Sequence, residues 1–90
     1  MSDTASDSLI EYPCDFPIKV MGEAHEDFAG TVCHVVRAHA PDFDAASIQA
    51  RASTGGRYVS LTCTVRVQSR EQLDNLYRDL STHPAVAMVL

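Results

Sequence analysis

The sequence predicts an α+β protein with a ferredoxin-like βαββαβ sandwich, and two kinds of pattern support this. Segment 58–68 alternates apolar and polar residues, which is the period-two pattern of a strand with one buried face. Segment 26–38 and the segment after Ser69 instead carry apolar residues at helical spacing. Because an antiparallel sheet can leave one face open to water, we expect both helices on the same face of a four-stranded antiparallel sheet.

The first strand is expected at 18–21, with Ile18 and Val20 facing the core. Pro17 precedes it, and proline cannot donate a ladder hydrogen bond in a central strand. The first helix is expected at 26–38, with Glu26 and Asp27 in its first turn, where acidic groups suit the helix dipole. Its apolar stripe consists of Phe28, Val32, Val35, Val36 and His39, and Pro41 prevents its continuation.

The second strand is expected at 46–53, and a glycine-containing turn joins it to the third strand at 58–68. Ser69 is expected to cap the second helix, and Gln72 has the spacing that completes a capping box. His83 and Pro84 end this helix, and the last strand is expected at 86–90. With right-handed crossovers the strand order is 4-1-3-2, so the second and fourth strands form the edges.

Length and composition fit one small domain, which we place at 9–90 after a polar, acidic tail at 1–8 that we expect to be disordered. The net charge of −5 argues against general nucleic-acid binding, because phosphate neutralisation needs a basic surface. The N-terminus lacks the pattern of a signal peptide, and no apolar run is long enough to span a bilayer. We therefore expect a soluble, cytoplasmic protein.

Residues that would support catalysis or metal binding are missing, so we expect no enzyme, no cofactor and no metal. A copper-chaperone site would need a cysteine pair after the first strand, and an acylphosphatase-like site would need an arginine early in the first helix. The four histidines lack the spacing of a helical metal pair. Cys33 and Cys63 are expected to be small buried hydrophobes, which leaves Cys14 as the candidate reactive thiol.

The open face of the sheet is the first candidate site. Three cations and one aromatic residue are expected there as a partner or ligand surface: Lys19, Arg51, Tyr58 and Arg66. Cations gathered on one face of an acidic protein attract an acidic partner, and the alternative is that they are only solvated strand residues. The apolar last strand could also pair with another chain, because no lysine or proline protects its edge. RNA binding ranks lower, because Tyr58 has no second aromatic beside it.

Four segments together resemble the YbeD-like family, a set of small bacterial proteins of unknown function: EYPCDFPIKVMG, VVRAHAP, STGGRYVSLTCTV and EQLDNLYRDLSTHPAVAMVL. The resemblance covers about 9–90 and implies a fold similar to ACT-type regulatory domains, without catalytic residues. ACT domains that bind amino acids use a glycine-containing loop after the first strand, at a subunit interface. Gly22 has the comparable place here, and His25 lies in the same loop, although MGEAHED departs from the usual acidic-x-x-glycine pattern.

The sequence thus predicts a non-enzymatic regulatory or adaptor module that binds a protein partner or itself, through the open face or an edge strand. The alternative is an ACT-type sensor of an amino acid or related metabolite, with its ligand near Gly22 and His25 at a homodimer interface. No membrane partner is expected.

Overall fold

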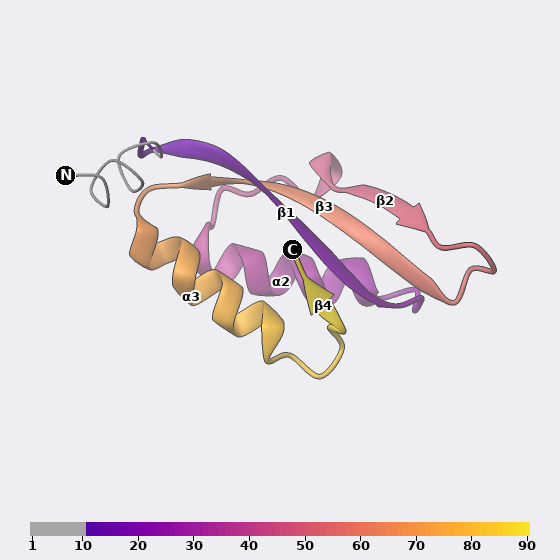
Figure 1. Cartoon of the computed structure of the whole chain (residues 1–90). Coiled ribbons are helices and arrows are strands. Elements are labelled where there is room, and N and C mark those ends of the chain that lie inside the picture. Colours follow the sequence, from indigo (N-terminus) through magenta and orange to yellow (C-terminus); the bar gives the residue numbers. More distant parts are fainter. Residues whose placement is uncertain (1–10) are drawn as a thin grey trace, which may run out of the picture.

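The computed structural model describes residues 11–90, which form a sheet layer and a helix layer (Figure 1). The strands are β1 (Cys14–Glu23), β2 (Gln49–Ala52), β3 (Tyr58–Val67) and β4 (Met88–Val89). The helices are α2 (Phe28–His39) and α3 (Arg70–Ser81), and a short 3-10 helix, η1, spans Ala45–Ser47. The predicted βαββαβ order is confirmed. The tail predicted at 1–8 lies outside the described residues.

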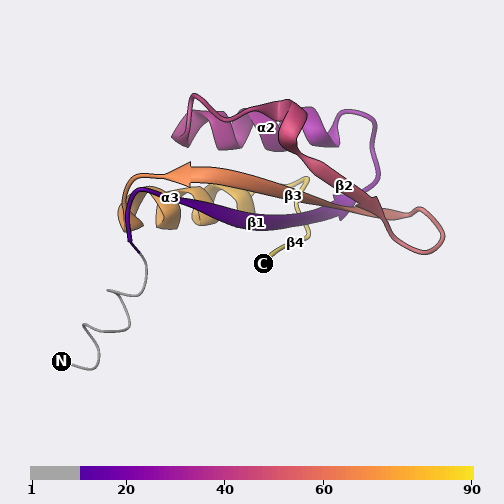
Figure 2. The same cartoon turned by 90° about the horizontal axis from the view of Figure 1, so that it is seen from above.

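The strands form one antiparallel sheet in the order β2-β3-β1-β4, which is the predicted order 4-1-3-2 read from the other edge. Both helices pack against one face, and Figure 2 shows α2 standing off the sheet on that side. The core lies between the layers and is formed mainly by Ile18, Val20, Phe28, Val32, Val36, Leu61, Cys63, Val65, Val67, Leu73, Leu76 and Leu80. Within residues 11–90, no helix lies on the opposite face of the sheet.

Strand β1 is longer than the predicted 18–21, because Pro17 does not interrupt it. The N–H of Lys19 donates to the carbonyl oxygen of Leu90 at 3.0 Å, so odd-numbered residues of β1 direct their backbone groups toward β4. The β4 strand pairs with only Val20 and Met21, which leaves that side of β1 without a strand at Pro17. Proline is therefore tolerated, because its missing N–H would have pointed to the unpaired side.

Strand β2 is shorter than the predicted 46–53, because η1 occupies its start. The Asp44 carboxylate begins η1 by accepting a hydrogen bond from the backbone N–H of Ala46 at 3.0 Å. Ala50 and Ala52 lie opposite Leu61 and Val59, on the helix side of the sheet, but both are exposed. The β2–β3 hairpin extends past the ends of both helices in Figure 1, so no helix covers them.

Strand β4 is also shorter than the predicted 86–90, although its backbone pairing extends beyond its bounds. Leu90 exchanges hydrogen bonds with Lys19 in both directions, at 2.8 and 3.0 Å, and the N–H of Ala87 donates to Met21 at 2.8 Å. Because backbone groups alternate in direction along a strand, the N–H and C=O of Val89 point to the outer edge.

The ends of the two helices differ in detail from the prediction. Helix α2 begins at Phe28, so Glu26 and Asp27 precede its first turn. Ser69 caps α3 as predicted, because its Oγ accepts a hydrogen bond from the N–H of Gln72 at 3.2 Å. The Gln72 side chain does not close a capping box on Ser69. Its Oε1 accepts from the N–H of Gln68 at 2.6 Å, and its Nε2 donates to the carbonyl of His39 at 2.8 Å.

The Cys63 thiol gives a prediction for stability at high pH. Burial, followed by the neighbouring Cys33, raises the pKa of Cys63 from 9.0 to about 11. The unfolded chain therefore releases this proton first, and the free energy of unfolding should fall between about pH 9 and 11. Two pKa units correspond to about 2.7 kcal/mol. Urea unfolding of the wild type and of Cys63→Val across this range measures the effect.

Burial also raises the pKa of Tyr77, which adds a pH dependence of the same sign in both proteins. The difference between the wild type and Cys63→Val therefore isolates the thiol. Equal slopes in the two proteins would contradict the prediction.

Candidate functional site

The open face of the sheet is organised into rows by the strand register. Residues that lie opposite one another on neighbouring strands share a face, and one row across the sheet consists of Leu90, Lys19, Thr62 and Gln49. The next row consists of Met88, Met21, Ser60 and Arg51. The register therefore places two cations, on β1 and β2, on either side of the hydroxyl groups of β3.

A shallow groove of about 360 Å³ lies between these cations. This cationic groove is lined by Lys19, Gln49, Ala50, Arg51, Ser60 and Thr62. No acidic residue lines it, and neither cation forms an ion pair within the described residues 11–90. Two positive charges, two hydroxyl groups and an amide give the groove donors suited to a carboxylate or another anion.

The structure separates Arg66 from the other cations that the sequence placed on this face. Its guanidinium Nη1 lies 3.2 Å from Oδ1 of Asp15, which is directly opposite on β1. Arg66 is also four residues from Thr62 along β3, which corresponds to about 13 Å of strand. The sequence-predicted surface thus divides into the groove with Lys19 and Arg51 and a separate, neutralised end with Arg66.

An apolar strip lies beside the cationic groove on the same face, and we define it as Met21, Met88 and Leu90. Met88 is 52% exposed and Leu90 is 60% exposed, although both are large hydrophobic residues. Val89 pairs with Val20 of the core face, so its two neighbours point to the open face. Sequence reasoning treated the last strand only as an edge, although its alternation could have placed Met88 and Leu90 here.

Tyr58, the remaining residue of the predicted partner surface, lies where the open face meets the hairpin. Tyr58 is 42% exposed, and the Arg57 guanidinium carbon lies 5.8 Å from the centroid of its ring. Tyr58 lies opposite Glu23 and also lines a small apolar hollow together with Met21 and Arg51. Tyr58 therefore extends the exposed apolar surface to the other side of Met21.

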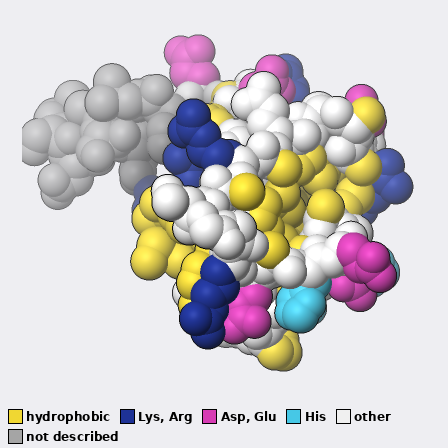
Figure 3. All heavy atoms as spheres, turned by 90° about the vertical axis from the view of Figure 1, so that its right-hand side faces the viewer, with side chains coloured by type: hydrophobic (Ala, Val, Ile, Leu, Met, Phe, Trp, Pro, Cys, Tyr) yellow, Lys and Arg dark blue, Asp and Glu magenta, His cyan; other side chains and the backbone are white. Residues whose placement is uncertain are grey.

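A second candidate site lies at the end of the molecule where β1 leads into α2. Figure 3 shows hydrophobic side chains gathered there in a hollow with charged side chains around it. This end cleft has a volume of about 540 Å³ and is lined by Glu23, His25, Tyr58, His83, Pro84, Ala85, Val86 and Ala87. The predicted small-molecule loop therefore forms one wall, and the α3–β4 connection forms another.

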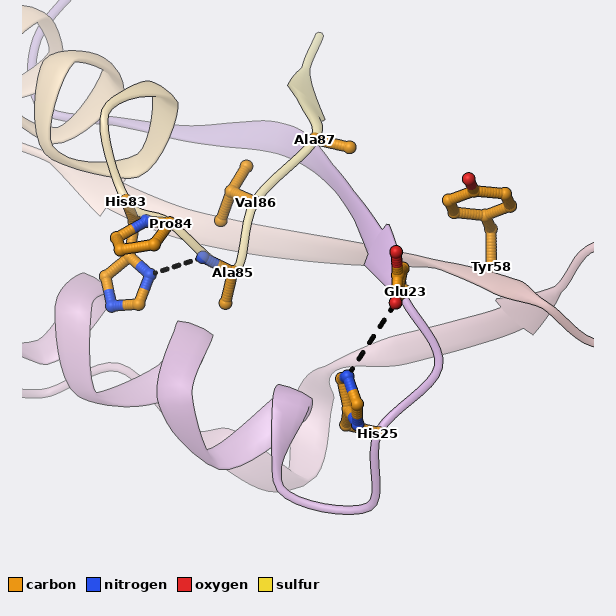
Figure 4. Close-up of a pocket in the computed structure, with 8 residues that line it drawn as sticks. All are labelled: Glu23, His25, Tyr58, His83, Pro84, Ala85, Val86 and Ala87. Atoms are coloured by element: carbon orange, nitrogen blue, oxygen red, sulfur yellow. Dashed lines mark hydrogen bonds and ion pairs between the residues drawn. The ribbon is translucent and has the colours of Figure 1, made fainter.

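The polar groups of the end cleft do not converge on one point (Figure 4). Nε2 of His25 lies 3.9 Å from Oε1 of Glu23, at one side of the cleft. His83 lies on the other side, and its Nδ1 accepts a hydrogen bond from the N–H of Ala85 at 3.1 Å. Among the described residues, no group of three His, Cys, Asp or Glu side chains could hold a metal ion.

Gly22 lines the core rather than the cleft. A Cβ atom at this position would lie 2.5 Å from the carbonyl oxygen of Ala85 and 2.6 Å from Cε1 of Phe28. The glycine therefore permits the α3–β4 connection and the first turn of α2 to approach the end of β1. Its role in the predicted small-molecule loop is to bring the walls of the end cleft together.

Comparison with known proteins places the chain among small bacterial proteins. Residues 7–90 match the family described as "Protein of unknown function (DUF493)". The UPF0250 protein of Janthinobacterium sp. (strain Marseille) is 60% identical over 94% of this chain and 93% of its own length. The UPF0250 protein NE1487 of Nitrosomonas europaea is 52% identical over 93% of this chain and 97% of its own length.

The solution structure of protein HP0495 from H. pylori has the same fold. The TM-score is 0.70 at 13% identity, with 90% of this chain and 85% of that chain covered. Among the described residues, no helix has the length and apolar character needed to cross a membrane.

The packing role of Gly22 gives a prediction with an internal control. Gly22→Ala should destabilise the protein by about 1–3 kcal/mol, because the added methyl group overlaps backbone and ring atoms. Gly30→Ala should instead stabilise it by about 0.5–1 kcal/mol, since Gly30 is in the exposed part of α2 with nothing within 4 Å of a Cβ. Thermal unfolding followed by circular dichroism measures both changes. An unchanged melting temperature for Gly22→Ala would contradict the packing role.

Proposed function

The chain belongs to the DUF493 family, whose function is unknown, and from that premise we propose that it is a non-enzymatic adaptor or regulatory module. It binds a protein partner through the open face of its sheet. Such a module regulates its partner by binding alone, since no catalytic group is assigned to the open face.

One observation carries this proposal: within residues 11–90, exposed hydrophobic side chains share the face that no helix covers with Lys19 and Arg51, which form no ion pair there. The three large hydrophobic residues exposed within 11–90 are Tyr58, Met88 and Leu90, which all lie on or beside that face. Exposed apolar patches with polar surroundings are typical of protein interaction sites. Lys19 and Arg51 also concentrate positive charge on this side of a chain whose net charge is −5. Such an uneven distribution favours an acidic partner.

Self-association is the second form of the same proposal. Within residues 11–90, no strand lies beside the outer edge of β4, to which the N–H and C=O of Val89 point, and Met88 and Leu90 flank Val89 on the open face. A second copy could pair along this edge and extend the sheet. The measured mass of the complex distinguishes a second copy from another protein.

A small-molecule sensor of ACT type is the second candidate function, and the end cleft favours it. Its volume of about 540 Å³ lies in the range of small-ligand sites. His25 and Glu23 lie on its wall and could hydrogen-bond an amino acid or a related metabolite.

Affinity capture with two matched variants tests the adaptor proposal. The tag is placed at the N-terminus, and the protein is captured from its native host at low salt as wild type, Arg51→Glu and Arg66→Glu. Both variants change an exposed arginine on the same sheet face by two charge units. We expect a stoichiometric protein partner that is recovered with Arg66→Glu but reduced at least about tenfold with Arg51→Glu, since one lost charge contact commonly costs this much. Equal recovery with both variants would exclude the open face.

Thermal shift measurements test the sensor. A metabolite that occupies the end cleft at one hundred times its Kd should stabilise the fold by about 2.7 kcal/mol. His25→Ala should reduce this shift, whereas Arg51→Glu should leave it unchanged, because Arg51 lies outside the cleft. An unchanged melting temperature across the amino acids and their keto-acid and amide derivatives would rule the sensor out.

A further inference from the structure

We propose that the partner segment that docks on the open face is an amphipathic α-helix with acidic side chains next to its apolar stripe. This inference rests on the proposed adaptor function and names the chemistry of its partner. The juxtaposition of the cationic groove and the apolar strip carries it.

The backbone of the sheet argues for a helix. In a sheet the N–H and C=O groups point sideways to the neighbouring strands, so the open face itself presents side chains and no free backbone groups. An extended peptide buried against this face would lose water from its own backbone groups without gaining partners. A helix satisfies those groups internally and can lie on the face at no such cost. Extended partners belong instead to the sheet edges.

The cationic groove argues for acidic side chains. Strand β3 separates β1 from β2, and Lys19 and Arg51 lie in neighbouring rows, so their backbones are about 10 Å apart across the strands and about 7 Å apart along them, or about 12 Å in all. Carboxylates one or two turns apart on a helix are separated by about 5–11 Å, which fits two such long and flexible side chains. The hydroxyl groups of Ser60 and Thr62 lie between the cations and can donate to the same carboxylates.

The neighbouring acidic groups do not cancel this charge. Asp15 is paired with Arg66 at the far end of the face. Glu23 is four residues from Lys19 along β1, about 13 Å of strand, and its carboxylate lies beside His25. Within residues 11–90, therefore, no Asp or Glu side chain pairs with Lys19 or Arg51 at the groove.

The apolar strip argues for amphipathic character. Met88 lies on β4 beside Met21 of β1, and Leu90, which directly follows β4, lies beside Lys19, so the apolar strip borders the cationic groove. A helix that rests apolar side chains on this strip can turn carboxylates on its adjacent flank to the groove. Methionine side chains adapt to partners of different shape, which suits a groove that receives a helix.

Titration of ¹⁵N-labelled protein with synthetic peptides tests the inference by NMR. Three stapled helices share the same leucine stripe, and their flanking positions carry Glu, Gln or Lys. We expect the Glu peptide to bind at least about tenfold more tightly than the Lys peptide, and more weakly as salt rises, because exposed charges are screened. The shifted amides should cluster at Lys19, Met21, Arg51, Ser60 and Met88.

Two variants and a fourth peptide complete the design. Arg51→Glu should weaken binding of the Glu peptide about tenfold. Arg66→Glu should change it less than about twofold, because Arg66 lies about 13 Å of strand from Thr62 of the groove and exposed charges at that distance are screened. The NMR spectrum of each variant also reports whether it is folded. The fourth peptide has the composition of the Glu helix with interior prolines and cannot form a helix, so we expect it to bind weakly.

The inference is wrong if the Glu and Lys peptides bind equally, or if the proline peptide binds as tightly as the Glu helix. It is also wrong if the shifted amides are confined to α2 and α3, or if no amide shifts at millimolar peptide. Tighter binding of a uridine oligonucleotide to the same residues would likewise overturn it. The adaptor proposal is tested separately, by the affinity capture with Arg51→Glu and Arg66→Glu. If capture yields a partner that is sensitive to Arg51→Glu but contacts the face through a basic or extended segment, the proposed function holds and this inference is wrong.

Discussion

The ten-residue pairing of β1 with β3 is the constraint on which the other features depend. It runs from Cys14 opposite Val67 to Glu23 opposite Tyr58 without a break. Because side chains alternate between faces, a slip of one residue in this register would send the core residues of one strand to the solvent face. The same register that buries Ile18 against the helices therefore also places Lys19 and Thr62 side by side on the open face. The core and the candidate site are two consequences of one pairing.

The open face is not covered by α2 or α3, because contacts between these two helices hold both of them on the opposite side of the sheet. Nε2 of His39 lies 2.6 Å from Oδ2 of Asp79, and Gln72 donates to the carbonyl of His39 from the start of α3. These contacts join the end of α2 to both ends of α3 on the core side of the sheet. Each such hydrogen bond contributes about 1 kcal/mol, so the larger contribution comes from the shared apolar core.

Local patterns in the sequence were sufficient for the long third strand and the Ser69 cap, because each depends on neighbours within a few residues. The strand order instead followed from the order of the elements together with the handedness of the crossovers. The features that the sequence analysis missed depend on residues that are far apart in the sequence. Pro17 is accommodated because β4 ends before reaching it, and Arg66 is neutralised by Asp15, which is 51 residues away. The alternation within 86–90 was readable, but its face could be assigned only once Val89 was known to pair with Val20. Gly22 was read as part of a ligand loop, whereas its contact with Ala85 is visible only in the folded chain.

The two halves of the open face would contribute differently to binding. Fully burying a side chain such as Leu90 or Met88 contributes about 1.5–3 kcal/mol, and this term is insensitive to the identity of the partner's apolar group. Covering Lys19 and Arg51 removes water from two charges, which is unfavourable unless the partner supplies carboxylates in reach. A partner segment that is apolar but lacks acidic groups would gain binding free energy by covering the apolar strip. It would lose that free energy again by removing water from the two cations of the groove. The strip therefore supplies affinity and the groove supplies selectivity, and an acidic amphipathic helix is the segment that satisfies both.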